Sequence, residues 1–427
     1  MTGLPARGAH DRCATPRIGI TWAWFDPTEA KAWSGLTHNL VAAFERRGVF
    51  AGMYDATPWL PGPGARGWAE RMRRFAQSDG GGPVARRLVR PWLWRSGRAA
   101  MWPLSPEMAG AAALTNGVRR LRRMPPDVDA WLALSVHPPV RGRLVTLCDM
   151  SPSQFRTVGP TGPGSYWVPG ATRAQIEGHG RRLARMHRRA QVCAVASRWA
   201  GQSLVDDDGV DARRVHVVGF GHDVEMHDLP ERDWSVPRFL FVGRDWVRKN
   251  GAGVVRAFAQ VRQRVPSATL DVVGNHPPLD VEGVTGHGPL TRTERADREK
   301  LDRLSARSTC FVMPSVIEPF GIVYLEAAAH GIPSIATSIG GTADSVGEGG
   351  VLVDPADDEE LGRAMDRMAV PTEAAALGAV AFRRAASFTW DAVADRLLLA
   401  ATASSAHDPG PRASQGPLPV VDPSGAR

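Results

Sequence analysis

The sequence predicts an α/β protein with two domains, each built from a parallel β-sheet covered by helices on both faces. Its 427 residues suit two to three domains of about 150 residues, and a 43% share of apolar residues is enough to form their cores. Strand-like and helix-like segments alternate along both halves, which requires right-handed crossovers between parallel strands. Each half is therefore expected to be a Rossmann-like domain, with ligand bound at the carboxyl ends of the strands, between the domains.

The predicted elements of the N-terminal half follow a polar leader. A first strand is predicted over Arg17–Phe25, and a helix over Ser34–Arg47 because apolar residues recur there at helical spacing before a glycine. The stretch Pro58–Trp102 is rich in arginine, tryptophan, proline and glycine, which predicts an irregular insertion with one or two basic helices. Beyond it the pattern predicts strands at Trp131–Val136, Leu144–Leu147, Val192–Ala196 and Val215–Val218, a basic helix at Ala174–Arg189, and another helix before the last of these strands.

The C-terminal half follows a charged, proline-rich stretch, Gly219–Pro237, which suits a linker. After it, strands are predicted at Phe239–Val242, Thr269–Val273, Cys310–Pro314, Ser334–Ala336 and Val351–Val353, and helices near Gly253–Val265, Thr291–Ser305, Phe320–His330 and Asp357–Met368. The predicted organisation is a leader (1–16), an N-terminal domain (17–220), a linker (221–237), a C-terminal domain (238–380), a closing helix (381–403) and a disordered tail (404–427).

Charge is distributed unevenly along the chain. Residues 1–200 carry 29 basic and 12 acidic side chains, a net of +17, whereas residues 201–427 carry 23 and 32, a net of −9. This asymmetry predicts that the N-terminal half faces something anionic, such as a membrane surface, a phosphorylated substrate or nucleic acid, although a solvated arginine surface has the same composition. Only three of the basic residues are lysines, namely Lys31, Lys249 and Lys300.

Cysteine usage and hydropathy indicate the cellular setting. The four cysteines lie far apart without a C-x-x-C pair, so neither a disulfide framework nor a zinc knuckle is predicted. The chain has no run of 18 apolar residues, and Met1–Pro16 lacks the apolar stretch of a secretory signal. These features predict a protein of the reduced cytoplasm that is soluble, or peripheral at the inner face of the membrane.

The most informative stretch runs from Glu318 to Glu326, where a predicted buried strand gives way to a helix. Pro319 suits a first helical turn. A helix that starts at the carboxyl end of a parallel strand points unpaired amides into the ligand crevice, so the amides at residues 321–323 are predicted to hold an anion such as phosphate. Eight residues of helix rise about 12 Å, so the two glutamates are expected to reach separate points of one extended ligand and to accept from its hydroxyls. Glu326 also needs a partner, because its helix is otherwise apolar.

This stretch resembles the signature of glycosyltransferase family 4, the retaining GT-B enzymes of glycosyl transferases group 1, in which two glutamates separated by seven residues surround a Pro-Phe-Gly. The resemblance implies that Glu318 contacts hydroxyls of the donor sugar and that Glu326 holds the ribose of its nucleotide. It further implies that the main chain around Phe320, Gly321, Ile322 and Val323 binds the sugar and phosphate of the donor.

A second motif, Phe241–Gly251, follows the first strand of the C-terminal half. It resembles the diphosphate clamp of the same family. The resemblance implies that Arg244 and Lys249 bind the donor diphosphate and, in catalysis, stabilise the leaving nucleoside diphosphate as negative charge develops. Arg248 is the competing assignment, and a basic turn in contact with water alone is the structural alternative.

Further segments resemble the family in the same order and extend the resemblance over Arg17–Ala403. They imply the GT-B architecture, in which two Rossmann-like domains face a central cleft. These segments are the Gly-Gly turn Gly340-Gly341-Thr342, the strand Gly350–Asp354, the hinge phrase Val217–Asp223 with Phe220 in place of the common asparagine, and the returning helix Phe388–Ala394.

The N-terminal side of the expected site is less clearly marked. Ser34 and Gly35 open a helix after the first strand, as the family's N-terminal glycine loop does, so their amides are candidates for binding donor phosphate or acceptor, with a simple turn glycine as the alternative. The family commonly places a histidine from this domain beside the donor sugar. Here Asp149 lies near the aligned position, and His137 follows the preceding strand, so both are candidate catalytic residues.

Two other features have competing interpretations. The run Val84–Trp102 combines arginines with tryptophans and could lie against anionic lipid, but Pro91 and Gly97 interrupt any long amphipathic helix and favour an ordinary loop. D-x-D spacing occurs at Asp127–Asp129 and in Asp206–Asp208, as in metal-dependent transferases. The resemblance to a metal-independent architecture argues against that interpretation.

Together these motifs predict a retaining hexosyltransferase that moves a hexose from a nucleoside diphosphate sugar to a hydroxyl of a glycan, a lipid-linked or a small-molecule acceptor. The N-terminal domain is the expected acceptor domain. No cofactor and no metal are expected, and the expected partners are the nucleotide sugar, the acceptor and an anionic membrane in peripheral contact, without nucleic acid. Two alternatives remain open: a non-catalytic basic binding protein on a degenerate GT-B scaffold, and a GT-B epimerase.

Overall fold

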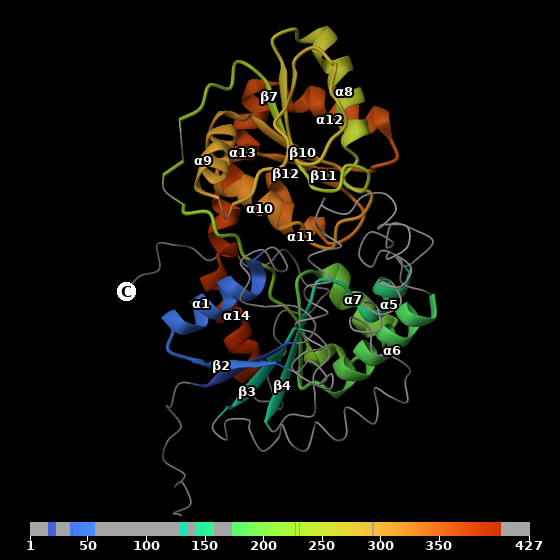
Figure 1. The fold of residues 1–427 in the computed structure, drawn as a ribbon, viewed down its shortest axis with the longest axis vertical. Coiled ribbons are helices and arrows are strands. Elements are labelled where there is room, and N and C mark those ends of the chain that lie inside the picture. Colours follow the sequence, from blue (N-terminus) through green and yellow to red (C-terminus); the bar gives the residue numbers. More distant parts are fainter. Residues whose placement is uncertain are drawn as a thin grey trace, which may run out of the picture.

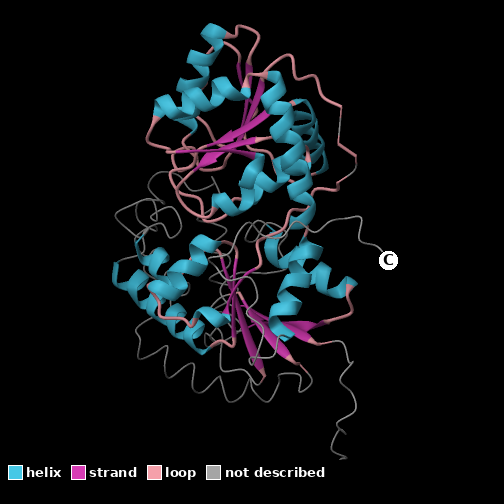
Figure 2. Ribbon diagram, turned by 180° about the vertical axis from the view of Figure 1, so that it is seen from behind, coloured by secondary structure: helices cyan, strands magenta, loops and turns pink. Residues whose placement is uncertain are grey.

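The computed structural model describes residues 16–22, 35–55, 128–134, 142–157, 173–226, 228–229, 231–292 and 294–402. Over these residues the chain forms two parallel six-stranded sheets, one in each half, with helices on both faces of each sheet (Figures 1 and 2). The predicted α/β architecture of two Rossmann-like domains is confirmed. No helix in the described ranges is long and apolar enough to cross a membrane.

The N-terminal sheet has the strand order β2-β1-β3-β4-β5-β6. Strands β3 and β5 are buried at every residue, as expected for strands covered on both faces. The strands are β1 (Ile18–Trp22), β2 (Phe50–Asp55), β3 (Ala130–Ala133), β4 (Arg143–Cys148), β5 (Val192–Val195) and β6 (Val215–Val217). The helices are α1 (Leu36–Arg46), α5 (Pro152–Thr157), α6 (Arg173–Arg189) and α7 (Arg198–Asp206).

The C-terminal sheet has the order β12-β11-β10-β7-β8-β9. Its strands are β7 (Arg238–Val242), β8 (Thr269–Val273), β9 (Val284–Gly286), β10 (Cys310–Met313), β11 (Ser334–Thr337) and β12 (Gly350–Val353). Its helices are α8 (Gly251–Arg264), α9 (Arg295–Arg307), α10 (Ile322–Ala329), α11 (Thr342–Val346), α12 (Asp358–Met368) and α13 (Pro371–Ala385). The order reverses between β7 and β10, and such a switch point leaves a crevice for ligand at the carboxyl ends of these two strands.

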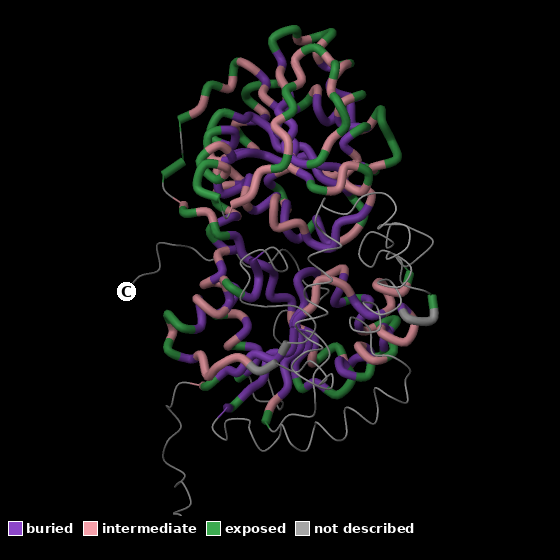
Figure 3. Tube along the Cα trace, in the orientation of Figure 1, coloured by how far each residue is buried: buried purple, intermediate pink, exposed green. Residues whose placement is uncertain are grey.

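The hydrophobic cores of the two halves meet at the domain boundary. The N-terminal core includes Phe320 and Leu325 from the C-terminal half in addition to its own strands. Phe320 contacts Phe220 edge to face, with ring centroids 5.5 Å apart. In Figure 3 the buried residues follow the strands of both sheets. The segment around Phe320 therefore packs simultaneously on both domains.

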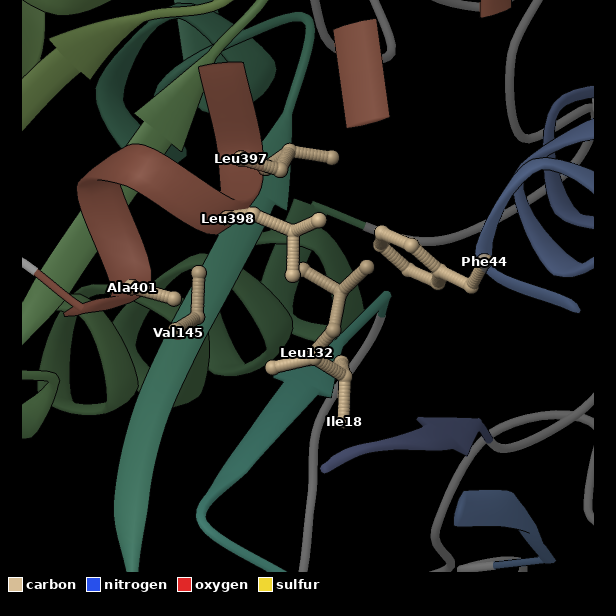
Figure 4. A pocket seen from close by; sticks show the side chains of 7 residues that line it. All are labelled: Ile18, Phe44, Leu132, Val145, Leu397, Leu398 and Ala401. Atoms are coloured by element: carbon tan, nitrogen blue, oxygen red, sulfur yellow. The ribbon is translucent and has the colours of Figure 1, made fainter. Parts of the chain in front are cut away.

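Helix α14 (Trp390–Thr402) runs from the C-terminal half back to the N-terminal sheet and packs on it. Arg47 at the end of α1 donates to Asp395 of this helix at 2.6 Å. Figure 4 shows, from close by, a small apolar pocket beside this helix, lined by Ile18, Phe44, Leu132, Val145, Leu397, Leu398 and Ala401. All of the lining side chains are apolar, so this pocket is a small packing defect of the hydrophobic core. It has no polar side chain that could bind a ligand.

Among the strands and α-helices of the described residues, β2, β9, α5, α11 and α13 are absent from the sequence prediction. Strand β9 has three residues and α11 has five, too few for a periodic pattern. Strand β2 contains Gly52 at a φ of 127°, which interrupts the alternation typical of a strand. Helix α13 begins with a proline in its first turn, a start signal that the pattern analysis overlooked. The leader up to residue 15, the run Val84–Trp102 and the tail 404–427 lie outside the described residues.

Candidate active site

Two loops at the switch point of the C-terminal sheet carry most of the predicted site residues. One loop follows β7 at residues 243–250 and the other follows β10 at residues 314–321, and the Val316 amide of the second donates to the Arg248 carbonyl of the first at 2.8 Å. The first loop also packs closely on the loop after β8, because a Cβ at Gly274 would lie 1.8 Å from the Gly243 carbonyl oxygen. Adjacent parallel strands thus bring residues that are distant in the sequence to one edge of the sheet.

Glu318 lies at the centre of this group. Its backbone forms an isolated bridge with Gly340, and the residue is only 6% exposed. One carboxylate oxygen accepts from the Lys249 ammonium, from Ser315 Oγ at 3.2 Å and from the Arg248 guanidinium at 3.5 Å. Burial alone would raise the pKa of Glu318, but the two cations outweigh it and lower that pKa below its usual range. The carboxylate is therefore ionised at neutral pH and fixed in position.

The basic residues of the predicted clamp lie at different depths. Lys249 is largely buried, and burial lowers its pKa, an effect that the Glu318 carboxylate offsets in part. Arg248 is equally buried and contacts both Glu318 and, at 3.8 Å, Asp245. Arg244 is exposed, and within the described ranges its guanidinium has no hydrogen bond or ion pair. Lys249 and Arg248 thus converge on one carboxylate, and Arg244 is available to a ligand.

Helix α10 starts at Ile322, two residues later than predicted. Gly321 precedes it with a φ of 81°, a left-handed conformation that glycine adopts without strain. Pro319 therefore lies before the helix, and the prediction that it occupies the first helical turn is wrong. The predicted helical rise between Glu318 and Glu326 is wrong for the same reason. The amides of Ile322 and Val323 lack partners within the helix, as at every helix start, whereas that of Tyr324 donates to the Gly321 carbonyl oxygen at 3.1 Å.

The side chains around this helix start belong to the cores. Phe320 is 2% exposed, and its carbonyl oxygen accepts from Ser345 Oγ at 2.6 Å. Ile322 packs against the N-terminal core and Val323 against the C-terminal core. Phe320 can therefore reach a donor only through its main chain, whereas Ile322 and Val323 are half-buried.

Glu326 lies on α10 and has a charged partner. Its side chain is 22% exposed, and the Nε of Arg292 lies 3.4 Å from its Oε1. The expectation that a carboxylate in this apolar helix needs a partner is confirmed. The sequence analysis did not find Arg292, because the residue lies in the loop before α9 and no periodic pattern connects it with α10.

The N-terminal domain contributes Asp149, immediately after β4. The side chain is half-buried. Burial raises the pKa of Asp149 to about 6, with a smaller rise from the negative charge of Glu318 and an opposing effect of main-chain amides. The structure thus brings Asp149 within electrostatic reach of Glu318, across the domain boundary.

The other N-terminal candidates are only partly described. Gly35 precedes α1 with a φ of 78°, so the left-handed backbone by itself explains a glycine there. Ser34 and His137 lie outside the described residues, and their predicted roles stay predictions.

The acidic residues with D-x-D spacing have protein partners. Asp208 is buried and accepts two hydrogen bonds from the start of α5. Asp206 and Asp207 each accept from the side chain four positions earlier, and Asp129 accepts from a main-chain amide at 2.8 Å. Asp127 lies outside the described residues.

The Gly-Gly turn connects the Glu318 loop with the other domain. A Cβ at Gly340 would lie 2.1 Å from the Glu318 carbonyl oxygen, and one at Gly341 would lie 2.0 Å from another carbonyl oxygen of the same loop. Asp344, just beyond the turn, accepts from the main-chain amide of Arg198 at 2.5 Å and from its Nε at 2.7 Å. The N-terminus of α7 is therefore capped from the opposite domain, a contact that no local sequence signal indicates.

The segment that carries these loops is similar to a known family. Residues 236–369 match the family described as Glycosyl transferases group 1. The match spans β7 to α12, and with it both loops at the switch point, so the resemblance stated on the Glu318–Glu326 motif is confirmed.

Curated relatives cover parts of the chain. D-inositol 3-phosphate glycosyltransferase of Rhodococcus opacus is 32% identical over 238 residues, which make up 49% of this chain and 53% of the relative. GDP-mannose-dependent alpha-(1-6)-phosphatidylinositol monomannoside mannosyltransferase of Mycolicibacterium smegmatis is 36% identical over 183 residues, 39% of this chain and 46% of the relative. Glycogen synthase of Mycobacterium tuberculosis is 29% identical over 272 residues, 61% and 64% respectively. The chain thus spans about half the length of the first of these relatives.

Solved structures extend the similarity over both domains. Sucrose-phosphate synthase from Thermosynechococcus elongatus has a TM-score of 0.58 at 19% identity, covering 89% of this chain and 96% of that one. The lipopolysaccharide outer core galactosyltransferase WaaB has a TM-score of 0.58 at 13% identity, covering 90% and 98%. These likenesses show the fold, which is GT-B.

Proposed function

We propose that the protein is a glycosyltransferase that moves a hexose from a nucleoside diphosphate sugar to an acceptor hydroxyl with retention of configuration. The observation that carries the proposal is the ionised Glu318 carboxylate, held by Lys249 and Arg248 at the switch point of the C-terminal sheet. A fixed carboxylate accepts from sugar hydroxyls, whereas cations and first-turn amides bind phosphate. The group that can bind sugar hydroxyls therefore lies beside the groups that can bind phosphate, as a sugar nucleotide requires.

In this proposal the donor lies along the carboxyl ends of β7 and β10. Arg244 and Lys249 bind its diphosphate together with the first-turn amides of α10, Glu318 accepts from the sugar hydroxyls, and Glu326 accepts from the ribose. As the bond between the anomeric carbon and the diphosphate oxygen breaks, negative charge develops on the diphosphate, and the cations already in place stabilise it. The proposal assigns no step to a metal ion or another cofactor.

The acceptor hydroxyl attacks the anomeric carbon on the face from which the diphosphate leaves, so configuration is retained. The departing diphosphate oxygen takes the hydroxyl proton, which balances the transfer. Asp149 is the described residue of the N-terminal domain that we propose to contact the sugar or the acceptor, because it lies within reach of the Glu318 charge and has a pKa of about 6.

We also propose that the acceptor is anionic or lies at an anionic surface. The N-terminal 200 residues carry a net charge of +17, and four arginines of α6, Arg181, Arg185, Arg188 and Arg189, are exposed on one side of that helix. The Rhodococcus and Mycolicibacterium relatives are named for inositol 3-phosphate and phosphatidylinositol substrates. These names support an acceptor that carries phosphate.

The first test is a thermal-shift panel of UDP, GDP, ADP and TDP sugars with the full chain. A ligand at about a hundred times its dissociation constant should stabilise the protein by about 2.7 kcal/mol. Turnover with the donor that responds, followed by the anomeric configuration of the product, tests transfer and retention. If none of the sugars stabilises the protein, the proposal fails in favour of a non-catalytic binding protein.

The second test separates the two glutamates by calorimetry. Glu326→Gln should weaken both the free nucleoside diphosphate and the sugar nucleotide at least tenfold, because ribose belongs to both ligands. Glu318→Gln should weaken the sugar nucleotide alone, because the free diphosphate lacks the sugar. Equal losses for both ligands in both variants would contradict this assignment. Glu348→Gln serves as the control, because this residue lies in the short 3-10 turn after α11 (Gly347–Gly349), outside both loops.

A further inference from the structure

Three charged groups form a chain at the meeting point of α10, the loop before α9 and the linker between the domains. The Nε of Arg292 lies 3.4 Å from Oε1 of Glu326, and its terminal nitrogen lies 4.0 Å from Oδ1 of Asp223. Arg292 is 27% exposed and Glu326 22%, whereas Asp223 is 44% exposed. One guanidinium is therefore shared between a carboxylate of the candidate site and a carboxylate of the linker.

Glu326 depends on this guanidinium for its charge. Burial raises the pKa of Glu326, the charge and hydrogen bond of Arg292 lower it, and the negative charges of Asp223 and Asp302 raise it. These residues come from the linker, from α9 and from the loop before it. His330 at the end of α10 also lies close to Arg292, but burial lowers the pKa of His330 to about 4, so it is neutral above pH 5.

Asp223 is anchored to the segment that joins the domains. Its neighbour His222 forms a bridge with Thr389, and His222 Nε2 lies 3.1 Å from the Ala385 carbonyl oxygen. A Cβ at Gly221 would lie 2.6 Å from the main chain of Trp390. The Asp223 carboxylate is therefore positioned by the linker and the start of α14. The Glu326 carboxylate is positioned by α10, which belongs to the C-terminal domain.

We propose that Arg292 is the positioning residue that holds the Glu326 carboxylate for the ribose hydroxyls, and that Asp223 competes for the same guanidinium and so couples the linker to the nucleotide site. This inference rests on the proposed function of Glu326. The guanidinium holds one oxygen of Glu326, and the other oxygen remains to accept from a pair of hydroxyls. Removing the charge of Arg292 should raise the pKa of Glu326, whereas removing the charge of Asp223 should lower it.

The experiment measures the titration of Glu326 in the unliganded protein and the binding of nucleotide to the same variants. Carbon-13 NMR of labelled glutamate carboxyls, assigned with Glu326→Gln, follows the titration. Arg292→Met should raise the pKa of Glu326 by about one unit, since an opposite charge at this distance lowers a carboxyl pKa by about one to three units. Asp223→Asn should lower it by a few tenths, because it removes a like charge at longer range. Arg292→Lys should restore most of the wild-type value.

Binding by calorimetry is then measured from pH 5 to pH 8 with UDP, GDP and ADP and with the 2′-deoxy form of the one that binds. If only ionised Glu326 holds ribose, binding weakens as the pH falls through its pKa, and this loss begins at a higher pH in Arg292→Met and at a lower pH in Asp223→Asn. At a pH below both midpoints, Arg292→Met should bind about tenfold more weakly than the wild type. It should also discriminate less between the ribose and deoxyribose forms.

Arg298→Met, an exposed arginine of α9, is the matched control and should change neither readout. An unchanged Glu326 titration in Arg292→Met, or shifts of the same sign in Arg292→Met and Asp223→Asn, would overturn the positioning role. If the titrations shift as expected but the wild type binds none of the nucleotides, the proposed function and the ribose role fail, and the coupling of the three charges stands.

Discussion

Lys249 has two tasks in the proposed mechanism, because it faces both the Glu318 carboxylate and the expected diphosphate. Lys249→Ala should lower turnover about 100-fold or more while it changes the thermal midpoint by a few degrees, since it removes a cation that acts mainly on charge developing in the transition state. Steady-state kinetics and calorimetry check the two quantities. Lys300→Ala is the control, because Lys300 lies on α9, outside both site loops. Full activity of Lys249→Ala would transfer the clamp role to Arg248.

Asp149 offers a test in which stability and activity move in opposite directions. Its pKa of about 6 lies above the ordinary value of about 3.9. The native state therefore holds a proton that the unfolded state has lost between about pH 4 and pH 6, so the protein loses stability as the pH rises through this window. Asp149→Asn removes this loss, and its thermal midpoint should equal that of the wild type near pH 4 and exceed it by several degrees at pH 7.

The same variant should transfer sugar at least tenfold more slowly if Asp149 takes part in the reaction. A variant that is more stable and less active cannot be explained by unfolding. Asp206→Asn, an exposed position of the same domain, should show neither effect. A flat difference in thermal midpoint between pH 4 and pH 7 would show that Asp149 is not held in a buried environment.

Some residues of the candidate site could be located from the sequence and others could not, for a physical reason. Glu318, Lys249 and Glu326 belong to short motifs at the ends of strands, so their spacing along the chain carries the information. Arg292, Asp223 and Asp344 act through ion pairs and hydrogen bonds between distant segments. Such contacts depend on how loops and domains pack, and no local spacing encodes them.

At the scale of elements, the central strands of the C-terminal sheet were predictable because they are buried apolar runs bounded by polar residues, glycine or proline. Strand β8 has the predicted bounds, Thr269–Val273, and β7 and β10 differ from prediction by one residue each. The start of α10 was not predictable, because the left-handed Gly321 displaces the helix beyond Pro319. The displacement matters for function, since it separates the Glu318 carboxylate from the helix that carries Glu326.

The contact between α7 and α11 should be worth more than an exposed ion pair. Asp344 is 3% exposed and accepts two hydrogen bonds from Arg198 of the other domain. Asp344→Asn should destabilise the protein by about 2 kcal/mol, because a buried hydrogen bond to a charged group contributes about 1.5–3 kcal/mol. Asp366→Asn, which breaks an exposed pair with Arg264, should cost less than about 1 kcal/mol. Equal thermal midpoints of the two variants would show that the Arg198 contact contributes no more to stability than an exposed ion pair.

At the scale of the whole molecule, the positive charge is concentrated in the N-terminal half. The proposed donor site lies in the C-terminal half and therefore does not explain this concentration. In the proposed function, Arg244, Lys249 and the first turn of α10 bind the anionic ligand of the C-terminal half, although the charge of that half is negative. The N-terminal half has the surplus of arginine, and α6 places part of this surplus on an exposed face. Glu177 is the single acidic residue of α6, and it lies 3.6 Å from Arg181. Three other exposed arginines of α6, Arg185, Arg188 and Arg189, therefore form a positively charged surface.

An anionic bilayer is the partner we expect for this surface, and vesicle flotation tests it. Binding to vesicles should rise with their content of anionic lipid and fall steeply between about 50 and 200 mM salt, because the attraction is screened over a Debye length of about 10 Å at 0.1 M. Arg185→Glu combined with Arg189→Glu should weaken flotation, since each basic residue near the surface contributes about 1 kcal/mol.

The matched control, Arg298→Glu with Arg303→Glu, changes the net charge equally but on α9 of the other domain, and should float like the wild type. Equal flotation with neutral and anionic vesicles at low salt would contradict the membrane contact, and equal losses in the two double variants would show that net charge, and not the face of α6, determines binding.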